Sequence, residues 1–175
     1  MKLLAFAASN STKSINKQLV TFATTLIEHT QVEVLDLNDY EMPIYSEDRE
    51  QASGIPAKAQ QFFDKIGNSD AVIIAYAEHN GSYSAAYKNI FDWCSRISQK
   101  LFQNKPLVLL SSSGGARGGA TVLKTATDSA VYFAGDVVAS LAVPNFYDVF
   151  DIENGLITDD AIEQQLTEAV NKLVK

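Results

Sequence analysis

The stretch Ala71–Tyr76, with the sequence AVIIAY, decides how the rest of the chain folds. It carries no charge, it follows Asp70, and the polar run Glu78–Ser82 comes soon after it. A short apolar run between polar boundaries predicts a strand that is buried on both faces. Such strands belong to parallel sheets with helices on both sides, so we expect strands and helices to alternate along the chain.

Apolar runs elsewhere predict four more strands, and apolar residues at helical spacing predict helices between them. The expected strands are Lys2–Ala8, Val32–Leu37, Leu107–Leu110 and Asp136–Ala142. The expected helices start at Ile15 and cover about Ala52–Ile66, about Ser84–Lys100, about Thr121–Phe133 and Asp159–Val174. The segments Tyr40–Glu50 and Pro144–Gly155 contain proline together with several acids, and are expected to be irregular.

This alternation favours one parallel sheet of five strands in an α/β fold, covered by helices on both faces. Crossovers between parallel strands are right-handed, which leaves this as the simplest topology. At 175 residues the chain is long enough for one well-packed core and too short to argue for two. We therefore expect a single domain over residues 1–175.

The composition excludes several classes of function. The formal net charge of −7 argues against non-specific nucleic-acid binding, which needs a positive field. No apolar run approaches the roughly 18 residues of a membrane span, and the apolar start is too short for a signal peptide, so we expect a cytoplasmic protein without a membrane partner. The single cysteine, Cys94, excludes an internal disulfide and is expected to fill space on a helix. His29 and His79 lack the spacing of metal ligands, so no metal site is expected.

Three loops that follow predicted strands are rich in Ser, Asn and Gly. We name them the first loop (residues 9–16), the second loop (78–83) and the third loop (113–119). Ligands of open α/β folds bind beyond the carboxyl ends of the strands, where all three loops begin. The sequence therefore predicts one ligand site made by these loops.

The first loop favours a phosphate ligand. Hydroxyl and amide side chains gather there at a helix start, which exposes unpaired backbone N–H groups and a partial positive charge. An alternative is that Ser11 or Ser14 only caps the helix. Neither the dinucleotide fingerprint G-x-G-x-x-G nor the P-loop motif G-x-x-x-x-G-K-[ST] is present, so those two phosphate sites are disfavoured.

The second and third loops favour a flat ring. Gly81 lets the backbone approach a ligand closely, and four glycines in the third loop have the same effect. His79 would lie against a ring, and Glu78 sits beside it. The alternatives are that His79 is a solvated loop residue, that Glu78 is a structural acceptor for N–H groups, and that the third loop is simply mobile.

These residues resemble the NAD(P)H-dependent FMN reductase family, which includes azoreductase-like, quinone reductase-like and chromate-reducing members. The family motif G-S-x-R-x-x-S-x-N is similar to residues 8–16, P-E-Y-N to residues 77–80, and L-K-N-x-x-D-W to residues 87–93. The family segments lP-x-y-x-x-D and G-x-x-G-G are similar to residues 42–48 and 115–119.

The resemblance implies a flavodoxin-like three-layer sandwich with strand order 2-1-3-4-5, FMN as cofactor, and NADPH or NADH as co-substrate. It places the FMN phosphate on the first loop, the isoalloxazine along the second loop and the pyrimidine edge at the start of the third. The implied cofactor-binding residues are Ser9, Ser11, Ser14, Ile15, Asn16, Glu78, His79, Asn80, Gly81, Ser82, Ser113, Gly114 and Gly115. Lys88, Asn89, Asp92 and Trp93 would fix their helix and, in family dimers, the subunit contact.

The sequence departs from the family pattern at three positions. Ser11 stands where the family has Arg, with Lys13 as a partial substitute, His79 replaces Tyr, and Ser84 replaces Pro. Loss of a charge-assisted phosphate contact costs about 1.5–3 kcal/mol. FMN offers about 31 atoms at about 0.3 kcal/mol each, so we expect micromolar binding.

The function implied is hydride transfer from NAD(P)H through FMN to a quinone, azo compound, metal oxyanion or free flavin. The cofactor carries that chemistry, so no catalytic side chain is assigned. A homodimer or homotetramer is expected from the resemblance. Three alternatives stay open: an electron carrier without nicotinamide turnover, a phosphorylated receiver domain, for which the acids after the first strand are lacking, and a homologue that has lost its flavin.

Overall fold

The structure is a computed structural model and describes residues 1–28 and 30–174. His29 therefore lies outside the described residues. Five parallel strands form one sheet in the order β2-β1-β3-β4-β5, which confirms the predicted fold class and strand order. The strands are β1 (Lys2–Ala8), β2 (Gln31–Leu35), β3 (Ala71–Tyr76), β4 (Pro106–Ser112) and β5 (Asp136–Val143).

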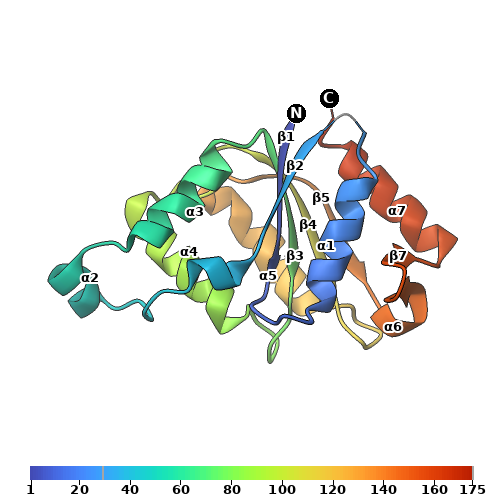
Figure 1. The fold of residues 1–175 in the computed structure, drawn as a ribbon, viewed down its shortest axis with the longest axis horizontal. Helices are drawn as coiled ribbons and strands as arrows, with labels where there is room; N and C mark the ends of the chain where they lie inside the picture. Colours follow the sequence, from blue (N-terminus) through green and yellow to red (C-terminus); the bar gives the residue numbers. More distant parts are fainter. Residues whose placement is uncertain (29, 175) are drawn as a thin grey trace.

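Helices cover both faces of this sheet (Figure 1). One face packs on α1 (Ile15–Thr25) and α7 (Asp160–Asn171). The other face packs on α3 (Ala57–Gly67), α4 (Ala85–Ile97) and α5 (Ala120–Ala130). Successive side chains of a strand point to opposite faces, so Ile73 enters one core and Ile74 the other. Every residue of β3 is buried, as its apolar sequence predicts.

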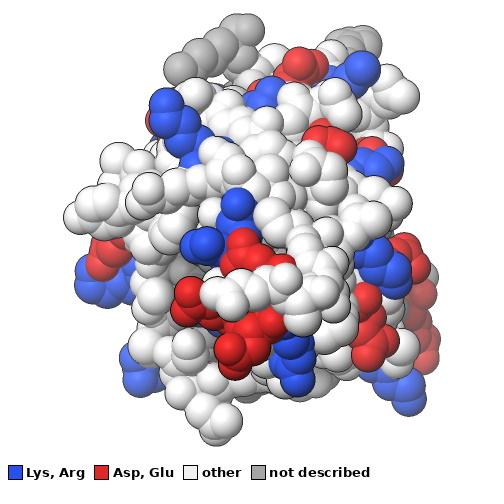
Figure 2. All heavy atoms as spheres, turned by 90° about the vertical axis from the view of Figure 1, so that its left-hand side faces the viewer, with Lys and Arg blue, Asp and Glu red and all other residues white. Residues whose placement is uncertain are grey.

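The helix expected from about Ala52 to Ile66 is present as α3, but its predicted start is wrong, because residues 52 and 53 end a separate short helix. This short helix, α2 (Glu47–Ser53), begins inside the segment Tyr40–Glu50 that was expected to be irregular and ends beyond it, and α3 starts only at Ala57. Between them Gly54 adopts a left-handed φ of 73° and Pro56 precedes the first residue of α3. These two residues end one helix and start the next. Figure 2 looks at the α2 side of the molecule and shows acidic side chains gathered at its centre, where the first turn of α2 carries three acids.

The predicted ends of several strands and helices also differ from the structure. β4 runs on through Ser111 and Ser112, which were expected in a loop, because their hydroxyls donate to the buried carbonyls of Gly118 and Val143. β2 ends at Leu35, and Leu37 belongs to the 3-10 helix η1 (Leu37–Tyr40). Another 3-10 turn, η2 (Val131–Phe133), follows α5. The segment after β5 contains α6 (Phe146–Val149) and a small hairpin of β6 (Phe150–Asp151) and β7 (Leu156–Ile157).

The residues that match the family motif on α4 fix the long excursion between β2 and α3. The Asn89 side chain donates to the carbonyl oxygens of Met42 and Pro43 and accepts from the backbone N–H of Tyr45. The Trp93 Nε1 donates to Pro43 O at 2.7 Å. Lys88 and Asp92, by contrast, form an exposed ion pair one turn apart. None of the helices in the described part of the chain has the length and apolar character that a membrane crossing needs.

The Asn89 contacts predict a clear loss of stability on truncation. Asn89→Ala removes the side-chain partner of Met42 O and of Tyr45 N, while Pro43 O keeps its bond from Trp93, and should lower the free energy of unfolding by about 1–3 kcal/mol. Urea denaturation measures it. The matched control is Lys88→Ala, which removes only the exposed pair on the same helix and should cost under about 0.5 kcal/mol. Equal effects of the two substitutions would contradict this account.

Candidate functional site

The first and third loops are joined by a buried side chain. The Asn16 amide donates from Nδ2 to Ser112 O at 3.1 Å and accepts at Oδ1 from Ser112 N at 2.9 Å. Asn16 stands in the first turn of α1, whereas Ser112 is the last residue of β4. This paired contact holds the start of α1 beside the point where the third loop leaves the sheet.

The second loop is tied, at its two ends, to the elements that flank the other two loops. Ser84, which caps α4 by accepting from Tyr87 N, also donates to Ala8 O, the last residue of β1, at 2.8 Å. Glu78 Oε2 accepts from Val122 N in the first turn of α5 at 2.9 Å. Glu78 is thus a structural acceptor at a helix start, where a negative charge is favoured. All three loops therefore meet at one edge of the sheet, at the bottom of Figure 1.

The first loop presents unpaired donors at the start of α1. Ser14 caps the helix by accepting from Lys17 N, and the buried Ser9 hydroxyl accepts from Ser11 N. The backbone N–H groups of Ile15 and Asn16, the two residues after Ser14, have no acceptor among the described residues, as expected for the first helical turn. The loop can therefore cap its helix and still offer backbone donors to an anion.

The positive charges near the first loop differ in availability. The Lys17 ammonium lies 2.5 Å from Asp36 Oδ2, and this hydrogen bond, together with one from the Asn38 backbone, lowers the pKa of Asp36. Lys17 is thereby neutralised by its partner. Lys13 is exposed and has no ion pair within the described part of the chain, so it is the cation free to meet an anionic ligand.

The second loop is a tight hairpin turn. The backbone groups of His79 and Ser82 exchange two hydrogen bonds of 2.9 and 3.1 Å, and Asn80 and Gly81 both have positive φ, at 52° and 76°. This is a type I′ turn, for which Asn-Gly is the strongest sequence signal, and sequence reasoning missed it. All four residues of the turn are exposed at the edge where the loops meet.

The third loop is anchored at its far end and open at its near end. Gly118 has a φ of 57°, and a Cβ there would lie 2.8 Å from the Val143 carbonyl, so only glycine fits. The Ser111 hydroxyl also donates to Gly118 O at 2.7 Å. Gly114 and Gly115 are exposed, and Ser113 is half-buried beside them. The open part is the part that the resemblance assigns to the cofactor.

A fourth segment joins the edge and was not anticipated. After β5, Asn145 N donates to Gly115 O and Phe146 N donates to Ser113 O, both at 3.1 Å. The Tyr147 ring lies directly over Gly114. The sequence could have predicted this segment, because β5 ends at the same edge of the parallel sheet as the other strands and the residues after it must start there.

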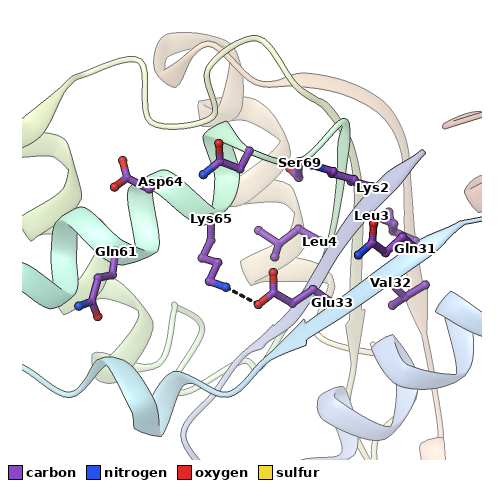
Figure 3. A pocket seen from close by; sticks show the side chains of 11 residues that line it. Lys2, Leu3, Leu4, Gln31, Val32, Glu33, Gln61, Asp64, Lys65 and Ser69 are labelled. Atoms are coloured by element: carbon purple, nitrogen blue, oxygen red, sulfur yellow. Dashed lines mark hydrogen bonds and ion pairs between the residues drawn. The ribbon is translucent and has the colours of Figure 1, made fainter.

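One hollow lies near the loops, and another lies far from them. A cavity of about 240 Å³ opens between Asn10 of the first loop, η1 and the first turn of α4. It is smaller than the about 300–1,000 Å³ of typical ligand pockets, so it would hold part of a ligand. A larger groove of about 610 Å³ lies at the opposite edge, where Lys65 of α3 reaches Glu33 of β2 (Figure 3). It contains no residue of the three loops.

The chemistry of the remaining side chains is limited. Burial raises the pKa of the Cys94 thiol to about 12, so this cysteine packs rather than reacts. In residues 1–28 and 30–174 there is no group of three His, Cys, Asp or Glu side chains that could hold a metal ion. The site is therefore built from backbone donors, hydroxyls, glycines and Lys13.

Comparison with known proteins gives this site a family. The sequence profile of the family described as NADPH-dependent FMN reductase matches residues 1–148. An NAD(P)H-dependent FMN reductase of Pseudomonas aeruginosa is 29% identical over 174 residues, covering 95% of this chain and 91% of that protein. A quinone reductase of Escherichia coli is 35% identical over 80 residues, covering 46% and 43%.

Solved structures show the same fold. The flavoenzyme NAD(P)H:(acceptor) oxidoreductase FerB of Paracoccus denitrificans matches with a TM-score of 0.78 at 23% identity, over 99% of this chain and 94% of that one. An FMN-dependent NADH-azoreductase of Bacillus anthracis in complex with FMN matches with a TM-score of 0.68 at 14% identity, over the whole of both chains. The chain belongs to the NADPH-dependent FMN reductase family. It is an FMN-dependent oxidoreductase that uses NAD(P)H.

The Asn16 contact predicts how the junction of the loops responds to substitution. Asn16→Ala leaves a buried N–H and a buried C=O of Ser112 unpaired and should lower the free energy of unfolding by about 2–4 kcal/mol in urea.

Asn16→Asp should make the loss depend on pH. A buried carboxyl facing Ser112 O has its pKa raised, and only its protonated form donates to that carbonyl. The stability gap to the native protein should therefore be small near pH 4, at the unfolded pKa, and widen as pH rises towards 7. Asn10→Asp, in an exposed position of the same loop, is the control and should show a gap that does not change with pH. A pH-independent gap for Asn16→Asp would contradict the assigned geometry.

Proposed function

We propose that the three joined loops bind FMN and that the protein passes reducing equivalents from NADPH or NADH to a small acceptor: a quinone, an azo compound, a metal oxyanion or free flavin. The observation that carries the proposal is the set of hydrogen bonds that brings the loops to one edge: the buried bonds of Asn16 with Ser112 and of Ser84 with Ala8, and the partly buried bond of Glu78 with Val122. A cofactor with an anion at one end and a flat ring at the other needs that convergence.

The first loop fits the phosphate. The free N–H groups of Ile15 and Asn16 and the partial positive charge of the start of α1 favour an anion. The hydroxyls of Ser9, Ser11 and Ser14 stand around that start. Lys13 supplies a charge that the family pattern takes from its arginine. The Asn16 side chain is occupied by Ser112, so its part in binding would be through its backbone N–H.

The second and third loops fit the ring. Residues 79–82 form an exposed turn, and Gly114 and Gly115 are exposed beside the half-buried Ser113, so a plane can approach both backbones closely. Residues 79–82 and 113–115 would hold the FMN ring, and FMN would supply the hydride and electron transfer between nicotinamide and acceptor. The protein would hold the ring, and N–H groups of the loops would stabilise the negative charge that reduction places on its carbonyl edge.

No side chain is assigned as an acid or base. The Glu78 carboxylate is engaged with the start of α5, and His79 is exposed on the turn. Protons that the reaction takes up or releases can be exchanged with water, because this edge of the sheet is open to solvent. We therefore propose that residues of this chain orient and stabilise, and that the cofactor reacts.

The same proposal includes the organisation of the protein. One sheet takes a strand from each part of the chain, which supports a single domain over residues 1–175. Ile44, with 74% of its surface exposed within the segment that α4 fixes, supports a homodimer or homotetramer through this side. A cytoplasmic location, where reduced nicotinamide is formed, completes the proposal.

FMN binding and reduction are testable in one preparation. Titration of the protein with FMN should change the flavin fluorescence with a Kd of order micromolar, so that part of the flavin is lost on dialysis. Anaerobic stopped-flow mixing of the loaded protein with NADPH and with NADH should bleach the flavin with at least one of them. Unchanged fluorescence would refute the FMN site, and binding without bleaching would leave an electron carrier.

The phosphate assignment has a sharper test, because riboflavin lacks only the phosphate. Lys13→Gln should weaken FMN binding about threefold to tenfold and leave riboflavin binding unchanged, with the FMN effect shrinking as salt is raised. Lys124→Gln is the control, since Lys124 is exposed on α5 and paired with Asp128. Equal losses for FMN and riboflavin would contradict a phosphate contact at Lys13.

A further inference from the structure

Tyr147 is a large aromatic side chain that stays 64% exposed although it lies against the candidate site. A Cβ built on Gly114 would lie 3.2 Å from Tyr147 Cε2 and 3.4 Å from Cδ2, so the ring edge sits on the bare backbone of the third loop. The rest of the ring is open to solvent. The exposed part of this aromatic ring, beside an edge lined by glycine, offers an apolar surface on which a ligand could pack.

The position of this ring is fixed by its neighbours. The segment before it is bonded to the third loop through Asn145 N and Phe146 N. The Tyr147 ring packs edge-on against Phe146 at a centroid distance of 5.8 Å. Phe146 is fully buried and stacks on Phe150 at 4.6 Å. Tyr147 is therefore held on a packed base in α6, a helix that Figure 1 shows at the same end of the sheet as the loops.

We propose that Tyr147 is a cofactor-binding residue, whose ring packs against the part of the flavin ring system held by residues 113–115. This inference rests on the proposed function, since it assigns one wall of the same site. Gly114 has no side chain, and this lets the Tyr147 phenol ring lie close to the backbone of the third loop, where the edge of the cofactor is expected. The ligand class is a flat heteroaromatic ring, and the contact is stacking or edge contact rather than a contact with phosphate.

The roles of Tyr147 and Lys13 are distinguished by comparing the affinities for FMN and riboflavin. Tyr147→Ala should weaken FMN and riboflavin equally, by about tenfold, the size found when an aromatic side chain that stacks on a base is truncated. Tyr147→Phe keeps the ring and should bind both ligands within about threefold of the native protein. Fluorescence titration with each flavin measures all four values.

Tyr132→Ala is the matched control. Tyr132 is 73% exposed on η2, beyond the end of α5 that lies away from the loops, and its loss should leave both affinities unchanged. Because Tyr147 is also exposed, its variants should fold, and urea denaturation with sedimentation velocity on each variant checks stability and assembly.

The outcomes distinguish the two proposals. If the native protein binds neither flavin, the proposed function fails. If the native protein binds both and Tyr147→Ala binds them as tightly, the flavin site stands and the role of Tyr147 is refuted. A Tyr147→Ala variant that changes only the oligomeric state would likewise refute it, and would assign the ring to a subunit contact.

Discussion

The paired hydrogen bond between the Asn16 amide and the Ser112 backbone is the contact on which the arrangement of the site depends. It spans 96 residues of sequence and joins a helix on one face of the sheet to the end of a central strand. Both partners are buried, so neither backbone group of Ser112 can turn to water instead. Without this contact the start of α1 and the third loop would have no fixed separation, and a ligand that spans them would have no preformed site.

Asn16 also shows how one residue serves both structure and binding. Its side chain points inward and satisfies the strand, whereas its backbone N–H belongs to the first turn of α1 and has no acceptor among the described residues. The same division holds for Ser14 and Ser84, whose small side chains close helix starts while leaving room at the edge. Buried side chains thus fix the loops, and the exposed backbone is left for the ligand.

The sequence predicted the fold because its strong signals agree: AVIIAY is apolar throughout, and apolar strands alternate with helical spacing. It failed where a local signal competed, as at Gly54 and Pro56, which separate α2 from α3 and move the start of the expected helix from about residue 52 to Ala57. The convergence of the loops followed from topology. The partners of Asn16 and Glu78 could not be predicted, because they depend on distances across the sheet. Tyr147 was missed because three residues separate it from the end of β5 and only the folded chain brings it to Gly114.

The net charge of −7 does not oppose an anionic cofactor, because the charge that matters is local. Asp36 is paired with Lys17 in the first turn of α1, next to the first loop, so the field of this carboxylate there is largely cancelled. Three further acids lie on α2, which projects away from the sheet in Figure 1, and one of them, Glu50, is paired with Arg96. Salt screens exposed charges over about 8–10 Å. The unpaired donors of α1 and the Lys13 ammonium therefore set the potential that a phosphate would meet, and an acidic surface elsewhere is compatible with binding it.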